Sequence, residues 1–142
     1  EAGATVIGTC SARNFDYVKG LGASDVRDYN EEDYLKGIEA DIVFDCAGGK
    51  STTDALAVLK PDGIIVSIVE FDIAETAQKA GRKGLWFLVQ PTGDQLRTVS
   101  KLIDDGKVKI PNITTMPFDN IQEAYAQSKG SRTVGKIVLK RD

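Results

Sequence analysis

Short runs of apolar, often β-branched residues recur along the first ninety positions and end in small polar residues or glycine. Each run is a strand candidate. The expected strands cover residues 5–7, 25–29, 41–47, 64–69 and 85–89. Because the runs are continuous rather than alternating, the pattern predicts a parallel sheet that helices cover on both faces.

Between the runs, apolar residues return every three or four positions, as they do along the buried face of a helix. The expected helices are one capped by Asn14 and ended by Gly22, one that follows a capping box at 51–54, one over 73–83, and one from Asp94 to Gly106. A weaker helix is expected over 33–37. Because strands and helices alternate, the sequence predicts a doubly wound α/β fold of the Rossmann type.

The pattern changes after Gly106. The expected elements are short strands at 108–110 and 114–118, a helix that Asp119 caps, and a last strand at 135–139. We therefore predict two parts. Residues 1–106 form a partial sheet domain, and residues 107–142 leave this sheet to pack on another domain.

A glycine fingerprint is expected at the end of the first strand of a dinucleotide-binding sheet, where it holds the pyrophosphate at a helix N-terminus. The first run here, Thr5–Ile7, leads instead into Cys10-Ser11-Ala12-Arg13, which is typical of the end of the second strand. The cluster Ala47-Gly48-Gly49 has neither the spacing nor the position of the fingerprint. We therefore expect a fragment whose sheet lacks its first strand and glycine loop.

Composition limits the class of protein. With 142 residues, of which 42 % are hydrophobic and 27 % charged, the chain can form a globular core. The net charge of −3 comes from scattered acids and bases, which disfavours binding to nucleic acids or to anionic membranes. No apolar run approaches the roughly 18 residues that cross a bilayer, and no targeting segment is recognised, so we expect a cytoplasmic location.

Cys10 and Cys46 are the two cysteines, and the chain has no histidine. Neither a zinc cluster nor a Cys–His nucleophile can be built from these residues alone. If a first strand fills the gap, the second and fourth strands lie about 10 Å apart, which is too far for a disulfide; if the gap closes, the two cysteines approach each other. We expect the native spacing and reduced thiols. The 21 carboxylates show no paired arrangement, and we assign neither a catalytic residue nor a metal ligand.

Several segments together resemble one protein family. They are Val6–Asn14, Leu21–Ala23, Asp28–Tyr29, Phe44–Gly49, Leu59–Gly63, Gln90–Gly93 and Gly135–Leu139. These segments span nearly the whole chain and resemble, in the right order, the C-terminal half of the medium-chain dehydrogenases/reductases. The quinone oxidoreductase branch, which includes zeta-crystallin, is the nearest match.

The resemblance implies a zinc-independent, NADPH-dependent reductase of quinones or α,β-unsaturated carbonyl compounds. In such an enzyme, hydride passes from the nicotinamide to an electrophilic carbon. The resemblance also implies that most of the substrate domain, of GroES-like fold, lies in an N-terminal half to which residues 107–142 return. The fragment alone is therefore expected to be inactive.

Ser11 and Arg13 are the candidate selectors of the cofactor, and Asn14 is a further candidate contact. The end of the second strand meets the adenosine ribose, where an arginine accommodates the 2′-phosphate of NADP and an acid favours NAD. Arg13 also precedes a helix, whose dipole disfavours a cation by about 0.3–1 kcal/mol unless an anion compensates. The alternatives are an exposed arginine without a ligand, and a Ser11 or Asn14 that only caps its turn or helix.

The resemblance adds four further parts to the candidate cofactor site. Tyr29 is placed near the adenosine phosphate, and a half-buried core tyrosine is the alternative. The backbone of Ala47, Gly48 and Gly49 is placed close to the cofactor, which glycine permits because it has no Cβ; an ordinary turn is the alternative. Phe87, Leu88 and Val89 are placed at the nicotinamide carboxamide, with strand core as the stronger interpretation, and Lys140 near a phosphate, with a frayed basic tail as the stronger one.

The strand at Leu85–Val89 is expected to be an apolar sheet edge. Exposed edges recruit partners, so we predict a homodimer in which this strand pairs with its copy. Two other functions stay open: a non-catalytic nucleotide-binding or structural module of the same fold, and a fragment of a zinc-dependent alcohol dehydrogenase.

Overall fold

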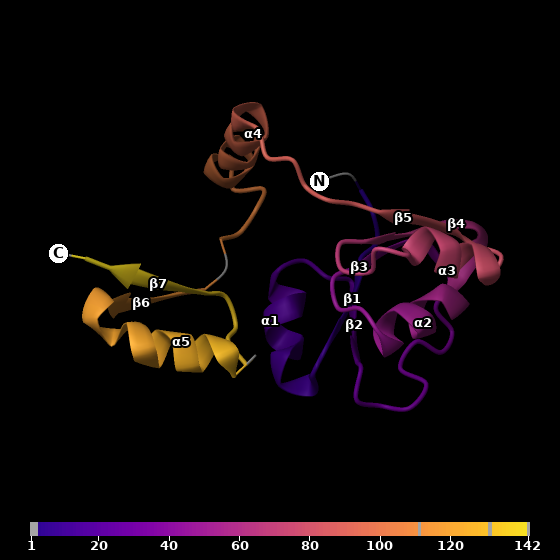
Figure 1. Cartoon of the computed structure of the whole chain (residues 1–142), viewed down its shortest axis with the longest axis horizontal. Helices are drawn as coiled ribbons and strands as arrows, with labels where there is room; N and C mark the ends of the chain where they lie inside the picture. The colour runs from indigo at the N-terminus through magenta and orange to yellow at the C-terminus, as the bar shows by residue number, and fades with distance from the viewer. Residues whose placement is uncertain (1–2, 111, 131, 142) are drawn as a thin grey trace. The chain divides into compact units, whose positions relative to one another are not determined.

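The computed structural model describes residues 3–110, 112–130 and 132–141. The chain forms two compact units, Glu1–Pro91 and Thr92–Asp142 (Figure 1). Among the described residues, none of the helices combines the length and the apolar character that a membrane span requires.

The first unit begins with a parallel pair of strands, β1 (Ile7–Cys10) and β2 (Asp25–Asp28). They are joined by a 3-10 helix, η1 (Ala12–Asn14), and by α1 (Phe15–Gly20). Helix α1 packs closely on β1, because a Cβ atom at Gly8 would lie 2.9 Å from Cγ1 of Val18. Cys10 pairs with Asp28, so the two strands end at the same level.

Three further strands of the first unit form a second parallel sheet in the order β3-β4-β5. The elements are β3 (Ala40–Asp45), α2 (Lys50–Ala57), β4 (Leu59–Ser67), α3 (Ile73–Lys79) and β5 (Lys83–Trp86). Asp45 pairs with Ser67, and Ser67 pairs with Trp86. The carboxyl ends of all three strands therefore meet at one edge of the sheet.

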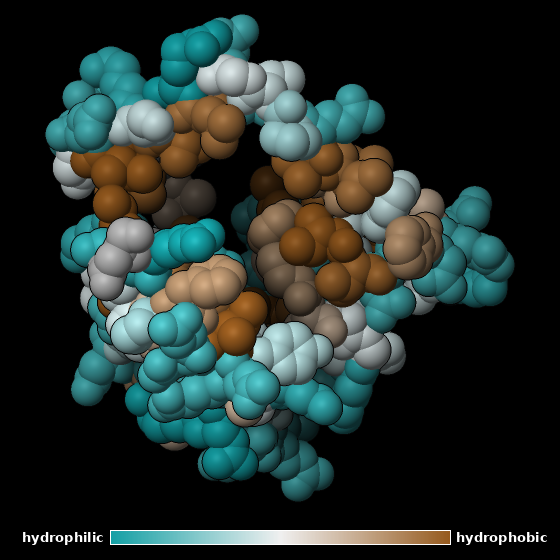
Figure 2. All heavy atoms as spheres, turned by 60° about the vertical axis from the view of Figure 1, so that its left-hand side comes forward, coloured by the Kyte–Doolittle hydropathy of each residue, from teal (hydrophilic) through white to brown (hydrophobic). Residues whose placement is uncertain are grey.

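The core of the first unit forms where α2 and α3 cover β4. It consists of Leu56, Leu59, Ile65, Ile73 and Ala77. Large apolar side chains are nevertheless exposed in both units, among them Ile42 and Phe44 of β3, and the space-filling view shows such side chains as brown patches (Figure 2). The face of β3 that carries Ile42 and Phe44 is therefore not covered within the described residues, contrary to the prediction for both faces of the sheet.

The parallel α/β architecture predicted from the sequence is confirmed. Among the described residues, no strand pairs with both β1 and β3, so the parallel strands of this unit form two separate sheets. In the doubly wound order 3-2-1-4-5-6, that place belongs to the first strand. The sheet thus has a gap where the strand with the glycine loop is expected.

The second unit contains two helices and a parallel strand pair. The elements are α4 (Gly93–Asp104), β6 (Ile113–Pro117), the 3-10 helix η2 (Phe118–Asn120), α5 (Ile121–Lys129) and β7 (Lys136–Lys140). The predicted strand at 108–110 is wrong, because the backbone N–H groups of Lys107 and Val108 close the end of α4 by donating to the carbonyl of Leu102. The predicted role of residues 107–142 in a substrate domain stays a prediction.

Several helix ends differ from the predictions. Residues 33–37 form turns instead of a helix, because Asp33 has a φ of 58°, which a right-handed helix cannot continue. Helix α3 ends at Lys79 and not at 83, because Gly81 has a φ of 67° and the N–H of Arg82 returns to the carbonyl of Ala77. As a result, β5 starts at Lys83 and ends at Trp86, earlier than the predicted strand.

The predicted caps were wrong in detail. Thr92, not Asp94, caps α4: its hydroxyl accepts from the N–H of Gln95, whose side chain accepts from the N–H of Thr92. Helix α2 begins directly after Gly49 and has no side-chain cap. Asn14 precedes α1 without a capping hydrogen bond, and α5 follows Asn120, not Asp119.

Candidate cofactor-binding site

Asp45, the last residue of β3, is 5 % exposed and accepts four hydrogen bonds. Its Oδ1 atom accepts from the backbone N–H groups of Ala47 and Gly48, both at 3.0 Å. Its Oδ2 atom accepts from the hydroxyls of Thr52 and Ser67, both at 2.8 Å. All four partners donate, and a protonated carboxyl would direct a donor of its own toward one of them, so this set of donors fits an ionised aspartate.

Ser67, opposite Asp45 at the end of β4, is fully buried. Its hydroxyl donates to Asp45 and accepts from the N–H groups of Val69, at 3.2 Å, and Glu70, at 3.0 Å. The Oε1 atom of Glu70 in turn accepts from the N–H of Gly49 at 2.5 Å. Asp45, the Gly48-Gly49 turn, Glu70 and Ser67 therefore form a closed ring of hydrogen bonds, which we call the Asp45 ring.

The turn between β3 and α2 depends on its two glycines. Gly48 and Gly49 have φ angles of 78° and 61°, which side-chain-bearing residues rarely adopt. A Cβ atom at Gly48 would also lie 2.9 Å from Oε1 of Glu70. The glycines therefore have a local reason to be here, and the contact of Ala47, Gly48 and Gly49 with a cofactor stays a prediction.

The pKa of Asp45 is lowered in the folded protein, whereas the pKa values of the two cysteines are raised. Burial alone raises the pKa of Asp45, but the hydrogen bonds from Gly48, Thr52, Ser67 and Ala47 outweigh it and hold this pKa below its ordinary value of 3.8. Burial, assisted by the charge of Asp45, raises the pKa of Cys46. Burial and then Asp28 raise that of Cys10. Both cysteines are free, and neither environment activates a thiolate.

The ends of β1 and β2 carry the other predicted contacts. The carboxylate of Asp28 accepts from the N–H of Ala12 at 3.0 Å and from both the backbone and the side chain of Asn30. Asp28 therefore fixes the turn that presents Ser11 and Arg13. Ser11 accepts a long 3.5 Å hydrogen bond from the Asn14 side chain.

Arg13 and Tyr29 are both exposed. Within the described residues Arg13 makes neither a hydrogen bond nor an ion pair, so its guanidinium is available to an anion. Tyr29 is 54 % exposed, so about half of its surface is covered and it is not one of the buried core residues. The cofactor contacts of Ser11, Arg13, Asn14 and Tyr29 stay predictions.

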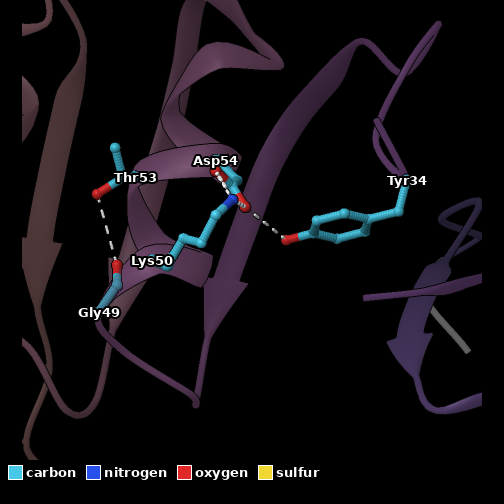
Figure 3. Close-up of polar contacts among 5 residues, drawn as sticks. All are labelled: Tyr34, Gly49, Lys50, Thr53 and Asp54. Atoms are coloured by element: carbon cyan, nitrogen blue, oxygen red, sulfur yellow. Dashed lines mark hydrogen bonds and ion pairs between the residues drawn. The ribbon is translucent and has the colours of Figure 1, made fainter. Parts of the chain in front are cut away.

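A polar contact joins the segment after Tyr29 to α2 (Figure 3). The Tyr34 hydroxyl donates to Oδ2 of Asp54 at 3.3 Å, and the Lys50 ammonium pairs with the same carboxylate at 2.6 Å. Asp54 thus offsets a cation at the positive end of the α2 dipole. Burial is the main reason for a raised pKa of Tyr34, so the phenol is neutral at physiological pH.

The candidate nicotinamide segment lies beyond the end of β5. Phe87, Leu88 and Val89 are 47, 64 and 61 % exposed, so the interpretation as strand core is wrong. The N–H of Phe87 still donates to the carbonyl of Ser67 at 2.9 Å, which ties this segment to the Asp45 ring. The cofactor contact of these three residues stays a prediction.

Each unit also has a hollow that other residues line. One of about 400 Å³ lies at the amino end of β3 and is lined by Asp41 and Lys60, which form an ion pair. The other, of about 190 Å³, is lined by Lys140 and Pro117 in the second unit. Lys140 ends β7, and its predicted contact with a phosphate stays a prediction.

Sequence reasoning missed four residues of the site: Thr52, Ser67, Glu70 and above all Asp45. The available signal was a single carboxylate at the end of an otherwise apolar run that leads into two glycines. In the part of the chain that the structure describes, no three His, Cys, Asp or Glu side chains could together hold a metal ion.

The fold and the edge at the carboxyl ends of its strands define a parallel α/β domain of the nucleotide-binding class. Comparison with protein families identifies it further. The chain belongs to the zinc-binding dehydrogenase family, whose model matches residues 21–139. The resemblance to the C-terminal half of the medium-chain dehydrogenases/reductases, in the quinone oxidoreductase branch, is confirmed.

Three relatives illustrate the match. The chain is 36 % identical over 146 residues to a probable zinc-binding oxidoreductase, mitochondrial, of Arthroderma benhamiae, covering 95 % of this chain and 44 % of that protein. It is 28 % identical over 138 residues to the chloroplastic NADPH-dependent alkenal/one oxidoreductase of Arabidopsis thaliana, covering 94 % and 33 %. The structure of the quinone oxidoreductase from Coxiella burnetii matches with a TM-score of 0.87 and 31 % identity, covering 97 % and 45 %. The chain spans less than half the length of each of these relatives.

Proposed function

We propose that the protein is an NADPH-dependent oxidoreductase that reduces quinones or α,β-unsaturated carbonyl compounds without zinc. The observation that carries the cofactor preference is the end of β1, where Ser11 and Arg13, whose side chain has no ion-pair partner within the described residues, stand in the place of the acid that favours NAD. The names of the relatives support the reaction, because one is an alkenal/one oxidoreductase that uses NADPH and another is a quinone oxidoreductase.

The residues of the edge fit such a cofactor. Arg13 and Ser11 would hold the 2′-phosphate with a charge-assisted hydrogen bond and a hydroxyl, and Tyr29 would cover the adenosine end. The glycine turn, whose φ angles larger residues rarely adopt, allows backbone to approach the cofactor. The cofactor supplies the hydride when bound, and the protein binds, orients and shields it.

One carboxylate near this site opposes the proposal. Asp28 lies beside the Ser11–Arg13 turn, where its negative charge repels a phosphate. Three donors engage it, the N–H of Ala12 and the two nitrogens of Asn30, and these reduce its repulsion. We expect the attraction of Arg13 for the phosphate to outweigh the repulsion that remains from Asp28.

The test is a titration of the full-length natural protein with NADPH and NADH, followed by nicotinamide fluorescence. Arg13→Ala should weaken NADPH binding about 10- to 100-fold, the value of one charge-assisted hydrogen bond, and leave NADH binding unchanged. Arg97→Ala, on exposed α4, is the matched control and should change neither.

Three outcomes contradict the proposal. Equal loss of both nucleotides removes Arg13 from the selection of the phosphate. No NADPH binding by the wild type favours a non-catalytic module of the same fold. Reduction of a saturated ketone together with bound zinc favours the zinc-dependent alcohol dehydrogenase. Residues 1–142 alone should neither bind the cofactor tightly nor turn over a substrate. We also propose a cytoplasmic location and a homodimer.

A further inference from the structure

The β3–α2 turn contains three successive backbone N–H groups, on Ala47, Gly48 and Gly49. Such a group of amides at a helix N-terminus commonly binds an anion. Here the amides of Ala47 and Gly48 donate to Asp45, and the amide of Gly49 donates to Glu70. All three amides are therefore used by carboxylates of the protein itself, and a phosphate at this turn would meet two negative charges.

We propose that Asp45 is a positioning residue that shapes this turn for the uncharged nicotinamide–ribose half of the cofactor and closes it to phosphate. The inference rests on the proposed function. It assigns the two halves of the cofactor to two places on the carboxyl edge. Arg13 holds the phosphate of the adenosine half at the end of β1, and the Asp45 ring holds the backbone that meets the nicotinamide half.

The register of the strands supports this division. A dinucleotide lies across the carboxyl ends of a doubly wound sheet, with its adenosine half at the second strand. Asp45, Ser67 and Trp86 end three adjacent strands on the far side of the gap from β1. The same ring also fixes the position of Phe87, because the carbonyl of Ser67 accepts its N–H.

Stability alone does not account for Asp45. A buried carboxylate loses its hydration, and a well-packed apolar residue is often as stable or more so at such a position. What the carboxylate supplies is a unique conformation: four donors converge on it from β4, from α2 and from two positions in the turn. A preorganised turn binds its ligand without a further ordering cost.

The experiment compares two probes on the full-length natural protein: NADPH, and adenosine 2′,5′-bisphosphate, which contains only the phosphorylated adenosine half. Asp45→Asn should weaken NADPH binding about tenfold and leave the bisphosphate unchanged. Arg13→Ala should weaken both. Asp41→Asn is the matched control, because this exposed aspartate lies on the same strand at its amino end and should affect neither probe.

A second variant keeps the test decisive if Asp45→Asn does not fold, as judged by circular dichroism. Thr52→Val removes one of the four donors with little change in shape and should weaken NADPH alone by a smaller factor. Equal weakening of both probes in the folded Asp45 or Thr52 variant would show a general structural role and overturn the inference. Unchanged NADPH binding would overturn it too.

Failure of the proposed function gives a different result. In that case the wild-type protein binds neither probe, and the inference falls with it. A third result is that the wild type binds both probes, Arg13→Ala weakens both, and Asp45→Asn and Thr52→Val bind both as tightly as the wild type. The proposed function then stands and the role of Asp45 is refuted.

Discussion

Gly84 of β5 lies under helix α3, and a single methyl group added there should destabilise the first unit. A Cβ atom at this position would overlap the carbonyl oxygen of Ile73 and lie 2.8 Å from Cβ of Ala77. Both neighbours are fully buried, and one of the overlapping atoms belongs to the backbone. Neither can move aside without shifting α3.

The magnitude follows from two opposing effects. Overpacking of a buried site costs about 1–3 kcal/mol, and replacing glycine by alanine returns about 0.4–1 kcal/mol by restricting the unfolded chain. Gly84→Ala should therefore lower the free energy of unfolding by about 1–2 kcal/mol. With a urea dependence of about 1–3 kcal/mol per molar, the unfolding midpoint should fall by roughly 1 M.

Trp86 provides the assay, since it is the single tryptophan of the chain and lies two residues from the substitution. Urea unfolding followed by its fluorescence reports on β5 and α3. Gly20→Ala in α1 is the control, because a Cβ atom there would meet no described atom within 4 Å apart from its chain neighbours and the backbone of its own helix. It should be neutral or slightly stabilising. A Gly84→Ala midpoint equal to or above that of the wild type would refute the packing argument.

Two further predictions concern acid and assembly. Because the pKa of Asp45 is lowered in the folded protein, this carboxylate contributes stability above about pH 4 that is lost as the pH falls through the folded pKa. The urea midpoint should fall less on acidification in Asp45→Asn than in the wild type, and an equal fall would contradict this. Leu85, exposed on edge strand β5, should support pairing with a second copy, so Leu85→Lys should reduce the mass in light scattering from dimer to monomer while Leu96→Lys on α4 does not. A monomeric wild type would rule this interface out. Phe87→Pro is a poorer probe of the interface, because proline also removes the N–H that donates to the carbonyl of Ser67.

The strands and helices of the first unit could be predicted because burial imposes their pattern on the sequence. Their ends could not, because tertiary contacts decide them. Gly81 ends α3 after Lys79, so the chain reaches the sheet sooner and β5 begins at Lys83, opposite Ile64. The predicted strand core of 87–89 therefore passes beyond the end of the strand and becomes an exposed segment near the candidate site. Because β5 ends three residues earlier than predicted, residues 87–89 lie at the surface and not in the core.

The candidate site divides in the same way. Arg13 could be proposed from local sequence, because its position after a strand and before a helix indicates its role without any contact to a distant part of the chain. Asp45 could not, because its two hydroxyl partners meet it only in the folded unit. Thr52 lies 7 positions away on α2, and Ser67 lies 22 positions away and is brought opposite Asp45 by the parallel register of β3 and β4. A slip of one residue would put the apolar side chain of Val66 or Ile68 opposite a buried carboxylate that then lacks a donor. Ala47, Gly48 and Thr52 would still donate to the carboxylate, so such a slip is penalised by the loss of one hydrogen bond to a buried charge. Conformational specificity at this edge and a fixed turn for the cofactor are therefore two consequences of the same carboxylate.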